Sequence, residues 1–251
     1  MRVAFGEKPA MIGYLTAGFP DLEGSIAAGH ALLDAGVDMI ELGLPYTDPG
    51  MDGPIIQHAG EQALQAGIRT PQVFEAVKAL SSRAPILVMT YYNPVLRYGI
   101  DRFARDLADA GGAGLVTPDL IPDEADEWIA ASEAHGLDRV FLVAPSSTPE
   151  RLALTAQSCR GFVYAASTMG VTGERAQMDE AAQTLVTRSR VAGAERVCVG
   201  VGISTPGQAR EVAGYADGVI VGSALVRALG DGIETLRTLA VELAEAVHSG
   251  R

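Results

Sequence analysis

The sequence predicts an α/β fold, a single TIM-type (β/α)8 barrel with eight parallel strands, that forms one domain over residues 1–251. Two observations lead to this prediction: short apolar runs rich in β-formers alternate with helical segments, and no stretch between them resembles a linker. Strict alternation implies parallel strands joined by crossover helices. Eight such units in 251 residues fit a closed barrel better than an open sheet. A doubly wound open sheet would also carry a glycine-rich loop after its first strand, and residues 16–20, TAGFP, are not one.

The eight expected strands recur at regular intervals along the chain. They are Met11 to Leu15, Val37 to Glu41, Ile86 to Tyr91, Gly114 to Thr117, Val140 to Val143, Phe162 to Ala165, Val197 to Gly200 and Gly218 to Val221. The segments with helical spacing between them include Ser25 to Ala35, Pro71 to Ser81, Asp101 to Ala110, Ala125 to His135, Pro149 to Gln157 and Pro206 to Ala213. Three of these helices carry a start signal, a threonine N-cap followed by proline, at residues 70–71, 148–149 and 205–206.

Composition narrows the classes of partner. The net charge of −12 disfavours nucleic acid and anionic membranes, because both require a positive patch. Cys159 and Cys198 are isolated in sequence, so we expect reduced core residues that bind no metal. No segment has the length of a signal peptide core or the roughly 18 apolar residues of a membrane span. We therefore expect a cytoplasmic protein.

Two acids mark the expected mouth of the barrel. Glu41 ends an apolar strand, and Asp52 lies in the long loop that follows. Active sites of such barrels lie at the carboxyl ends of the strands, where paired carboxylates serve as acid and base. A strand-capping glutamate and a turn aspartate are the alternative interpretation. Burial should raise the pKa of Glu41, whereas Asp52 should stay ionised.

Glycine-rich turns follow the last three strands, at residues 168–173, 202–204 and 222–224. Each could be an ordinary turn, but together on neighbouring strands they predict a phosphate site. Glycines let the backbone approach a ligand, and a helix N-terminus attracts an anion. Since these three motifs contain no Arg or Lys, binding would rest on backbone dipoles.

Other catalytic groups are disfavoured by position. Lys8 precedes the first strand and Lys78 lies in a helix, so neither could form a Schiff base at the mouth. None of the four histidines ends a strand, and no metal-ligand spacing occurs. Glu41 and Asp52 remain as the acid/base candidates, with Tyr164 at the end of the sixth strand as a third polar group.

From Ala10 to about Leu229 the chain resembles the tryptophan synthase alpha subunit family. The motifs that carry the resemblance are GYLTAGFPD (13–21), ELGLPYTDPGMDGP (41–54), MTYYNPVLRYGI (89–100), STMGVTG (167–173), GVGIS (200–204) and GSALV (222–226). Each motif is weak alone, but the six in this order are highly specific.

The resemblance implies cleavage of indole-3-glycerol phosphate to indole and glyceraldehyde 3-phosphate. Glu41 would be the acid/base at indole C3 and the glycerol hydroxyl, and Asp52 would accept a hydrogen bond from the indole N–H. Tyr164 would help to position the substrate. The phosphate would be held by Gly173, Gly202, Gly222 and Ser223. Tyr14, Met89 and Tyr91 would line the indole pocket, with core packing as the alternative for Met89.

The resemblance also implies a lid and a partner. Residues 170–178 would close over the site, with Thr172 contacting Asp52. No cofactor is expected in this chain, whereas pyridoxal phosphate is expected in a beta subunit that forms an alpha2-beta2 heterotetramer and receives indole. The loop after the second strand and residues 118–124 would face it, and the chain alone would be weakly active.

One departure and two competing functions stay open. Only about ten residues precede the first strand, where the family commonly has a helix, so we expect a less covered barrel floor. One competing function is that of indole-3-glycerol-phosphate synthase, which relies on lysines at strand ends that this chain lacks. The other is a catalytically silent subunit that only activates a partner, against which the presence of both acids argues.

Overall fold

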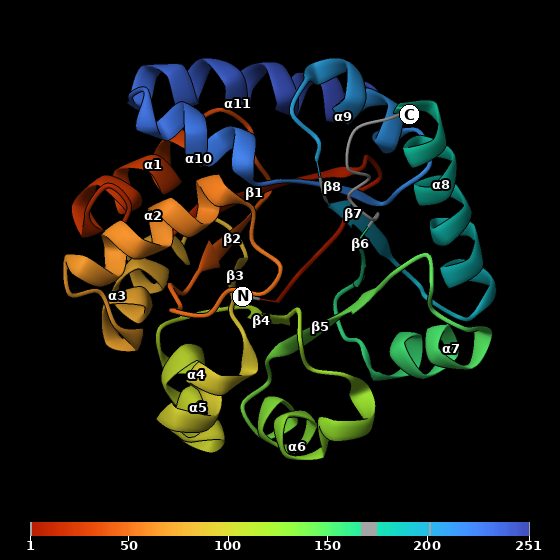
Figure 1. Ribbon diagram of the computed structural model, residues 1–251, viewed down its shortest axis with the longest axis horizontal. Coiled ribbons are helices and arrows are strands. Elements are labelled where there is room, and N and C mark those ends of the chain that lie inside the picture. Colours follow the sequence, from red (N-terminus) through yellow and green to blue (C-terminus); the bar gives the residue numbers. More distant parts are fainter. Residues whose placement is uncertain (1, 167–174, 201, 251) are drawn as a thin grey trace.

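The structure, a computed structural model, describes residues 2–166, 175–200 and 202–250, without the side chains of residues 175–179. Its eight parallel strands form a closed barrel in sequence order, with β1 pairing with β8. The helices surround this barrel (Figure 1). The predicted (β/α)8 barrel is therefore confirmed.

The strands agree closely with the expected runs. They are β1 Ala10–Thr16, β2 Met39–Gly43, β3 Ile86–Met89, β4 Gly114–Thr117, β5 Asp138–Val143, β6 Val163–Ala166, β7 Val197–Gly200 and β8 Gly218–Val221. The second strand lies two residues later than expected, so Glu41 is inside it and not at its end. The third ends at Met89, because a helix begins at Tyr92.

The helices are α1 Leu22–Asp34, α2 Pro54–Gln65, α3 Thr70–Leu80, α4 Tyr92–Tyr98, α5 Ile100–Asp109, α6 Asp126–Ala134, α7 Pro149–Ser158, α8 Arg175–Val191, α9 Pro206–Ala213, α10 Ser223–Gly230 and α11 Ile233–His248, with a 3-10 turn at Pro122–Glu124. Thr148 and Thr205 cap α7 and α9 as predicted, each accepting a backbone N–H. The prediction for Thr70 was wrong by one residue. Arg69 is the N-cap of α3, and its N–H donates to Gln72 Oε1 at 3.1 Å.

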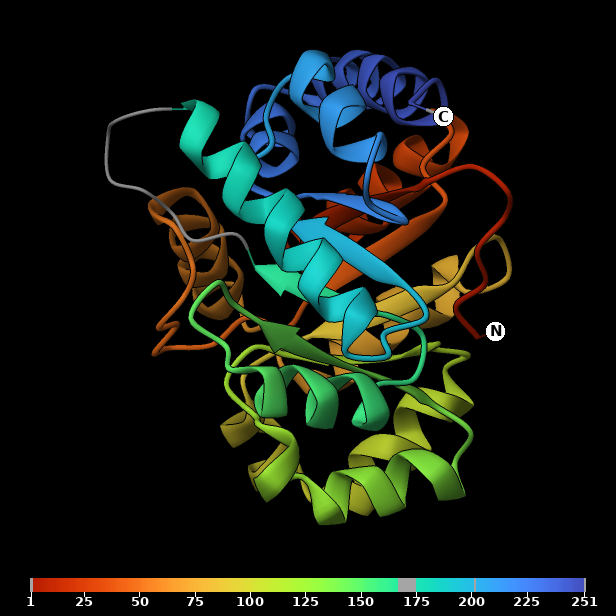
Figure 2. The same cartoon turned by 90° about the vertical axis from the view of Figure 1, so that its right-hand side faces the viewer.

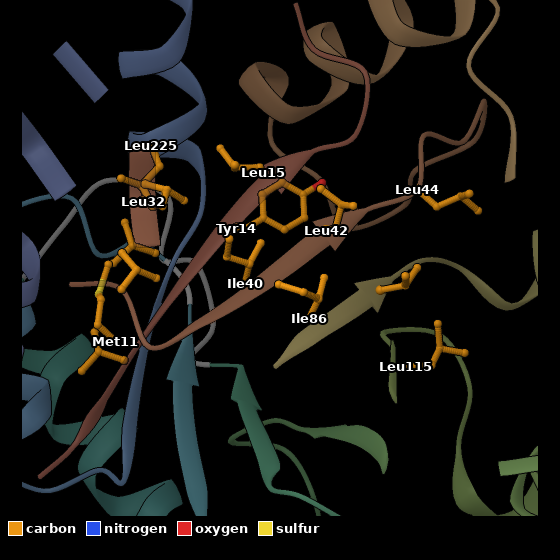
Figure 3. Close-up of a cluster of buried hydrophobic side chains, with 14 of the residues drawn as sticks. Met11, Tyr14, Leu15, Leu32, Ile40, Leu42, Leu44, Ile86, Leu115 and Leu225 are labelled. Atoms are coloured by element: carbon orange, nitrogen blue, oxygen red, sulfur yellow. The ribbon is translucent and has the colours of Figure 1, made fainter. Parts of the chain in front are cut away.

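Two apolar layers stabilise the barrel. The outer layer lies between strands and helices, and Figure 3 shows part of it, with Leu32 of α1 and Leu225 of α10 beside β1. Both leucines pack closely against Gly13. A Cβ atom at this position would clash with the Leu32 side chain. The inner layer fills the barrel and includes Ile12, Leu87 and Phe162. Because the interior is packed, a polar group inside it is costly unless it is hydrogen-bonded or lies near an open end of the barrel.

The floor of the barrel is covered without a helix. Residues 2–9 pass over the end from which the strands start (Figure 2). Phe5 packs edge-on against Phe162, with ring centroids 6.1 Å apart, and the Val3 N–H donates to Asp138 at 2.8 Å. An extended segment therefore covers part of the floor, and a floor less covered than that of the family stays a prediction. Over the part of the chain that is described, no helix combines the length and apolarity needed to cross a bilayer.

Candidate active site

A cavity of about 220 Å³ opens among the carboxyl ends of the strands. Most of the residues predicted for the site line it: Tyr14, Glu41, Asp52, Met89, Tyr164, Gly202, Gly222 and Ser223. Tyr91 is not among the lining residues, and Gly173 and Thr172 lie outside the described residues. The structure thus brings together residues from six strands and the loops that follow them.

Glu41 is fully buried in β2, in register with Tyr14 of β1 and Leu87 of β3. Within the described residues, neither carboxyl oxygen has a hydrogen-bond partner. A capping glutamate would bond to backbone N–H groups, so the structural alternative finds no support here. Burial raises the pKa of Glu41 from its ordinary 4.5 to about 8, as expected in direction. The group can therefore hold a proton at neutral pH and release it again.

Asp52 faces the same cavity from the loop between β2 and α2. Burial raises its pKa, and a hydrogen bond with the Tyr91 side chain opposes that increase. The two effects oppose each other, so the ionisation of Asp52 stays a prediction. Its loop is fixed locally, since Gln57 Nε2 donates to the Asp52 carbonyl oxygen at 2.7 Å.

Tyr91 holds this loop from behind. Its hydroxyl accepts a hydrogen bond from the Met51 N–H at 2.8 Å, and its ring lies 5.5 Å from that of Tyr46. Asn93 Nδ2 then donates to the Tyr46 hydroxyl at 2.9 Å. Tyr91 is thus not among the residues that line the cavity, and its place in an indole pocket stays a prediction. Tyr91 instead connects the start of α4 to the loop that carries Asp52.

Replacing Tyr91 with phenylalanine should lower turnover by roughly 10-fold, because Asp52 loses a hydrogen bond and its loop loses an anchor. The pKa of Asp52 should rise, since the Tyr91 hydrogen bond lowers it. Steady-state kinetics on the substrate proposed below would measure this effect. Tyr98→Phe is the matched control, because that hydroxyl bonds to Asp106, on the adjacent helix α5, at 2.7 Å. Equal losses in both variants would contradict the anchoring role.

Two phenols share the cavity with Glu41, and each lies over a glycine of the next strand. A Cβ at Gly43 would overlap the Tyr14 hydroxyl, and one at Gly200 would overlap that of Tyr164. Burial is the main cause that raises the pKa of both tyrosines, and the nearby Glu41 adds to it. Both phenols therefore remain neutral donors beside the carboxyl group.

The rest of the wall is apolar and was not predicted from the sequence. It comprises Met51, Ile56, Leu142, Ala166, Ile203 and Ile220. Met89 joins them at the cavity while also packing on the core. Alternation along β5 and β8 would have placed Leu142 and Ile220 inside the barrel, but which interior residues reach the cavity depends on the strand stagger. The wall suits a flat, apolar ring.

The opposite rim is made of backbone. Gly202 has a φ of 75°, in the left-handed region that favours glycine. Gly222 is the N-cap of α10 and makes no side-chain capping bond, so the first N–H groups of this helix are available to a ligand. Ser223 adds a hydroxyl. Among the described lining residues no Arg or Lys occurs, so an anion here would be bound by N–H groups and the helix dipole.

The described residues provide no cluster of side chains suited to bind a metal ion. Over residues 2–166, 175–200 and 202–250, leaving aside side chains 175–179, no group of three His, Cys, Asp or Glu residues is placed to hold a metal ion. Lys8 and Lys78 do not line the cavity. The arrangement therefore offers one proton-holding carboxyl, a second acid, two phenols and an anion rim.

Comparison with known proteins places this geometry in a family. Residues 3–249 match the family model described as tryptophan synthase alpha chain. The chain is 59% identical to the tryptophan synthase alpha chain of Mycobacterium avium (strain 104), over 96% of this chain and 90% of that protein. It is equally identical to that of Mycobacterium tuberculosis (strain H37Rv), over 97% and 90%.

Comparison with solved structures indicates the same family. Mycobacterium tuberculosis tryptophan synthase superposes with a TM-score of 0.91 at 59% identity, covering 97% of this chain and 94% of that one. The tryptophan synthase subunit alpha of Legionella pneumophila (strain Paris) gives a TM-score of 0.87 at 30% identity, covering 95% and 92%.

Proposed function

The chain belongs to the tryptophan synthase alpha chain family, and on that basis we propose that it is the lyase that cleaves indole-3-glycerol phosphate to indole and glyceraldehyde 3-phosphate. One observation carries the proposal. The unpartnered, buried carboxyl of Glu41 and the carboxyl of Asp52 face one cavity that also contains an apolar wall and a backbone rim suited to phosphate.

The substrate would bind across this cavity. Its indole ring would lie against the apolar wall near Met89 and Leu142, in the cavity that Tyr14, Glu41 and Tyr164 also line. Its phosphate would accept hydrogen bonds at Gly202, Gly222 and Ser223, and at Gly173, which lies outside the described residues. The glycerol chain then passes Glu41.

Cleavage requires that one proton is added to indole C3 and that another is removed from the hydroxyl on the carbon attached to C3. Glu41, protonated because its pKa is about 8, gives its proton to indole C3 and forms the indolium ion. The resulting carboxylate takes the proton of the hydroxyl on the carbon attached to C3. That carbon becomes the aldehyde as the carbon–carbon bond breaks, and the bond pair returns to the ring. Indole is released and Glu41 is protonated again, so one group serves both steps.

Asp52 would act on the ring nitrogen. As C3 is protonated, positive charge develops on the N–H, and a carboxylate that accepts its hydrogen bond stabilises that charge. We propose that the lid, residues 170–178, closes with Thr172 near Asp52 and excludes water. The chemistry uses side chains of this chain, so no cofactor is assigned to it.

The partner would be a tryptophan synthase beta subunit in an alpha2-beta2 complex. The chain superposes on a structure of Mycobacterium tuberculosis tryptophan synthase. We propose that the beta subunit holds pyridoxal phosphate and receives indole, and that both work in the cytoplasm. The loop after β2 and residues 118–124 would face it, and each presents an exposed apolar residue, Met51 at 42% and Ile121 at 41%.

Adding a beta subunit should increase indole release by about 10-fold or more, because binding would stabilise the closed site. Indole formed from indole-3-glycerol phosphate by the purified chain, with and without the partner, measures this. Ile121→Asp should weaken the activation, whereas Leu154→Asp, also an exposed apolar residue but on α7, should not. Equal rates with and without partner would contradict the coupling. No indole in either case would favour a silent subunit.

A further inference from the structure

A second, smaller cavity lies behind Asp52. Its volume is about 10 Å³, room for about one water molecule, and its polar lining residues are Tyr14, Thr16, Tyr46, Asp52 and Gln57. Tyr14, Asp52 and Ile56 also line the larger cavity, so the two spaces are neighbours with three lining residues in common. A molecule in the small cavity would therefore lie beside Asp52, which also lines the substrate cavity.

Thr16 gives this cavity a polar group that needs a partner. It ends β1, is only 2% exposed, and its Oγ1 has no hydrogen-bond partner within the described part of the chain. The hydroxyl lies near the Tyr14 phenol and lowers its pKa, but the two do not meet the geometry of a direct hydrogen bond. A buried hydroxyl left without a partner is destabilising, and an ordered water commonly provides one.

We propose that a single bound water occupies this cavity, linking Thr16 Oγ1, the Tyr14 hydroxyl and the Asp52 carboxylate, and that Thr16 is thereby a positioning residue for Asp52. The water accepts a hydrogen bond from the Tyr14 phenol, donates one to Asp52 and donates its second to Thr16 Oγ1. Two to four polar partners are what a buried water requires.

The surroundings of Asp52 show why a neutral donor matters there. Three phenols interact electrostatically with Asp52: Tyr14 from β1, Tyr91 before α4 and Tyr164 from β6. Glu41 from β2 lines the same cavity. Among the described residues lining either cavity no Arg or Lys is present to stabilise a carboxylate. Hydrogen bonds donated to the ionised form are therefore the means of opposing the effect of burial on its pKa.

Thr16→Val tests the proposal, because valine keeps the branched shape and removes the hydroxyl. The first readout, high-resolution crystallography, should show the water in the wild-type chain and in Thr16→Ser, and lose it in Thr16→Val. Thr90→Val is the matched control, since Thr90 is equally buried with an unpartnered Oγ1 but lines neither cavity.

The second readout rests on the proposed function. Losing the donated hydrogen bond makes the protonated form of Asp52 relatively more favourable, so the acid limb of the kcat profile should move up by about one pH unit in Thr16→Val. KM should change little, Thr16→Ser should restore the profile and Thr90→Val should leave it unchanged. A wild-type crystal without this water, or an unshifted limb in Thr16→Val, would overturn the proposal even with lyase activity intact. Absence of lyase activity would contradict the proposed function instead. The crystallographic result would still show whether the bound water is present.

Discussion

Glu41→Gln should lose about 10³-fold in kcat for cleavage of indole-3-glycerol phosphate, the range expected when a group that both gives and takes the proton is removed. Glutamine fits the same space but can neither protonate indole C3 nor accept the glycerol proton. Substrate binding should persist, since the ring and phosphate contact other residues. Timed assays of indole formation would measure kcat, and equilibrium binding of the substrate would measure affinity. Together they would separate the loss of turnover from any loss of binding.

Asp138→Asn is the matched control for this variant. Asp138 is also a buried acid, 2% exposed, but it lies at the start of β5 and bonds to the Val3 N–H at the barrel floor. It should keep kcat even if it loses stability. Near wild-type turnover in Glu41→Gln would end the assignment of Glu41, whatever the control does.

Glu41→Gln should also remove a pH dependence of stability. Folding raises the pKa of Glu41 from 4.5 to about 8, so the folded state binds the proton more tightly than the unfolded chain. This group therefore makes the protein less stable as pH rises through that interval, and most of the loss is complete above pH 8. Thermal melts measure this effect. The Tm of Glu41→Gln minus that of wild type should be higher at pH 9 than at pH 5.

The barrel was predictable because its signal is local and repeated. Strands β4, β7 and β8 have the predicted bounds, since each is a short apolar run delimited by glycine or polar residues. The Thr205-Pro206 start of α9 likewise depends on neighbouring residues alone. Such features need no knowledge of what packs on them.

The errors arose where distant contacts decide. The second strand extends to Gly43 because β1 and β3 both pair with it there, Thr16 with Gly43 on one side and Met89 on the other. The third ends early because Tyr92 begins α4, with its N–H donating to Asp119 beyond β4. Neither partner is visible in the run of residues itself.

The candidate site, like the fold, was predictable only where its features are local in the sequence. Glu41, Asp52 and the glycines stood out as polar or flexible residues near the carboxyl ends of expected strands or in the loops after them, where barrels place their sites. The position of Tyr91 behind the loop, the raised pKa of Asp52 and the small cavity at Thr16 all depend on how the loop after β2 folds back. Composition and spacing do not determine that path.

Asp52→Asn should lower kcat by about 10²-fold, less than the loss at Glu41, because it removes a charge that stabilises an intermediate and leaves both proton transfers possible. Asparagine can still accept a hydrogen bond from the indole N–H through its carbonyl oxygen, so substrate affinity should change little. Activity should also lose the acid limb that protonation of Asp52 causes. Asp48→Asn, on the same loop but exposed and lining neither cavity, is the control and should keep the wild-type profile. If Asp52→Asn retains full kcat with the acid limb unchanged, the charge on the ring nitrogen must be stabilised by another group, and Asp52 serves only to shape the loop.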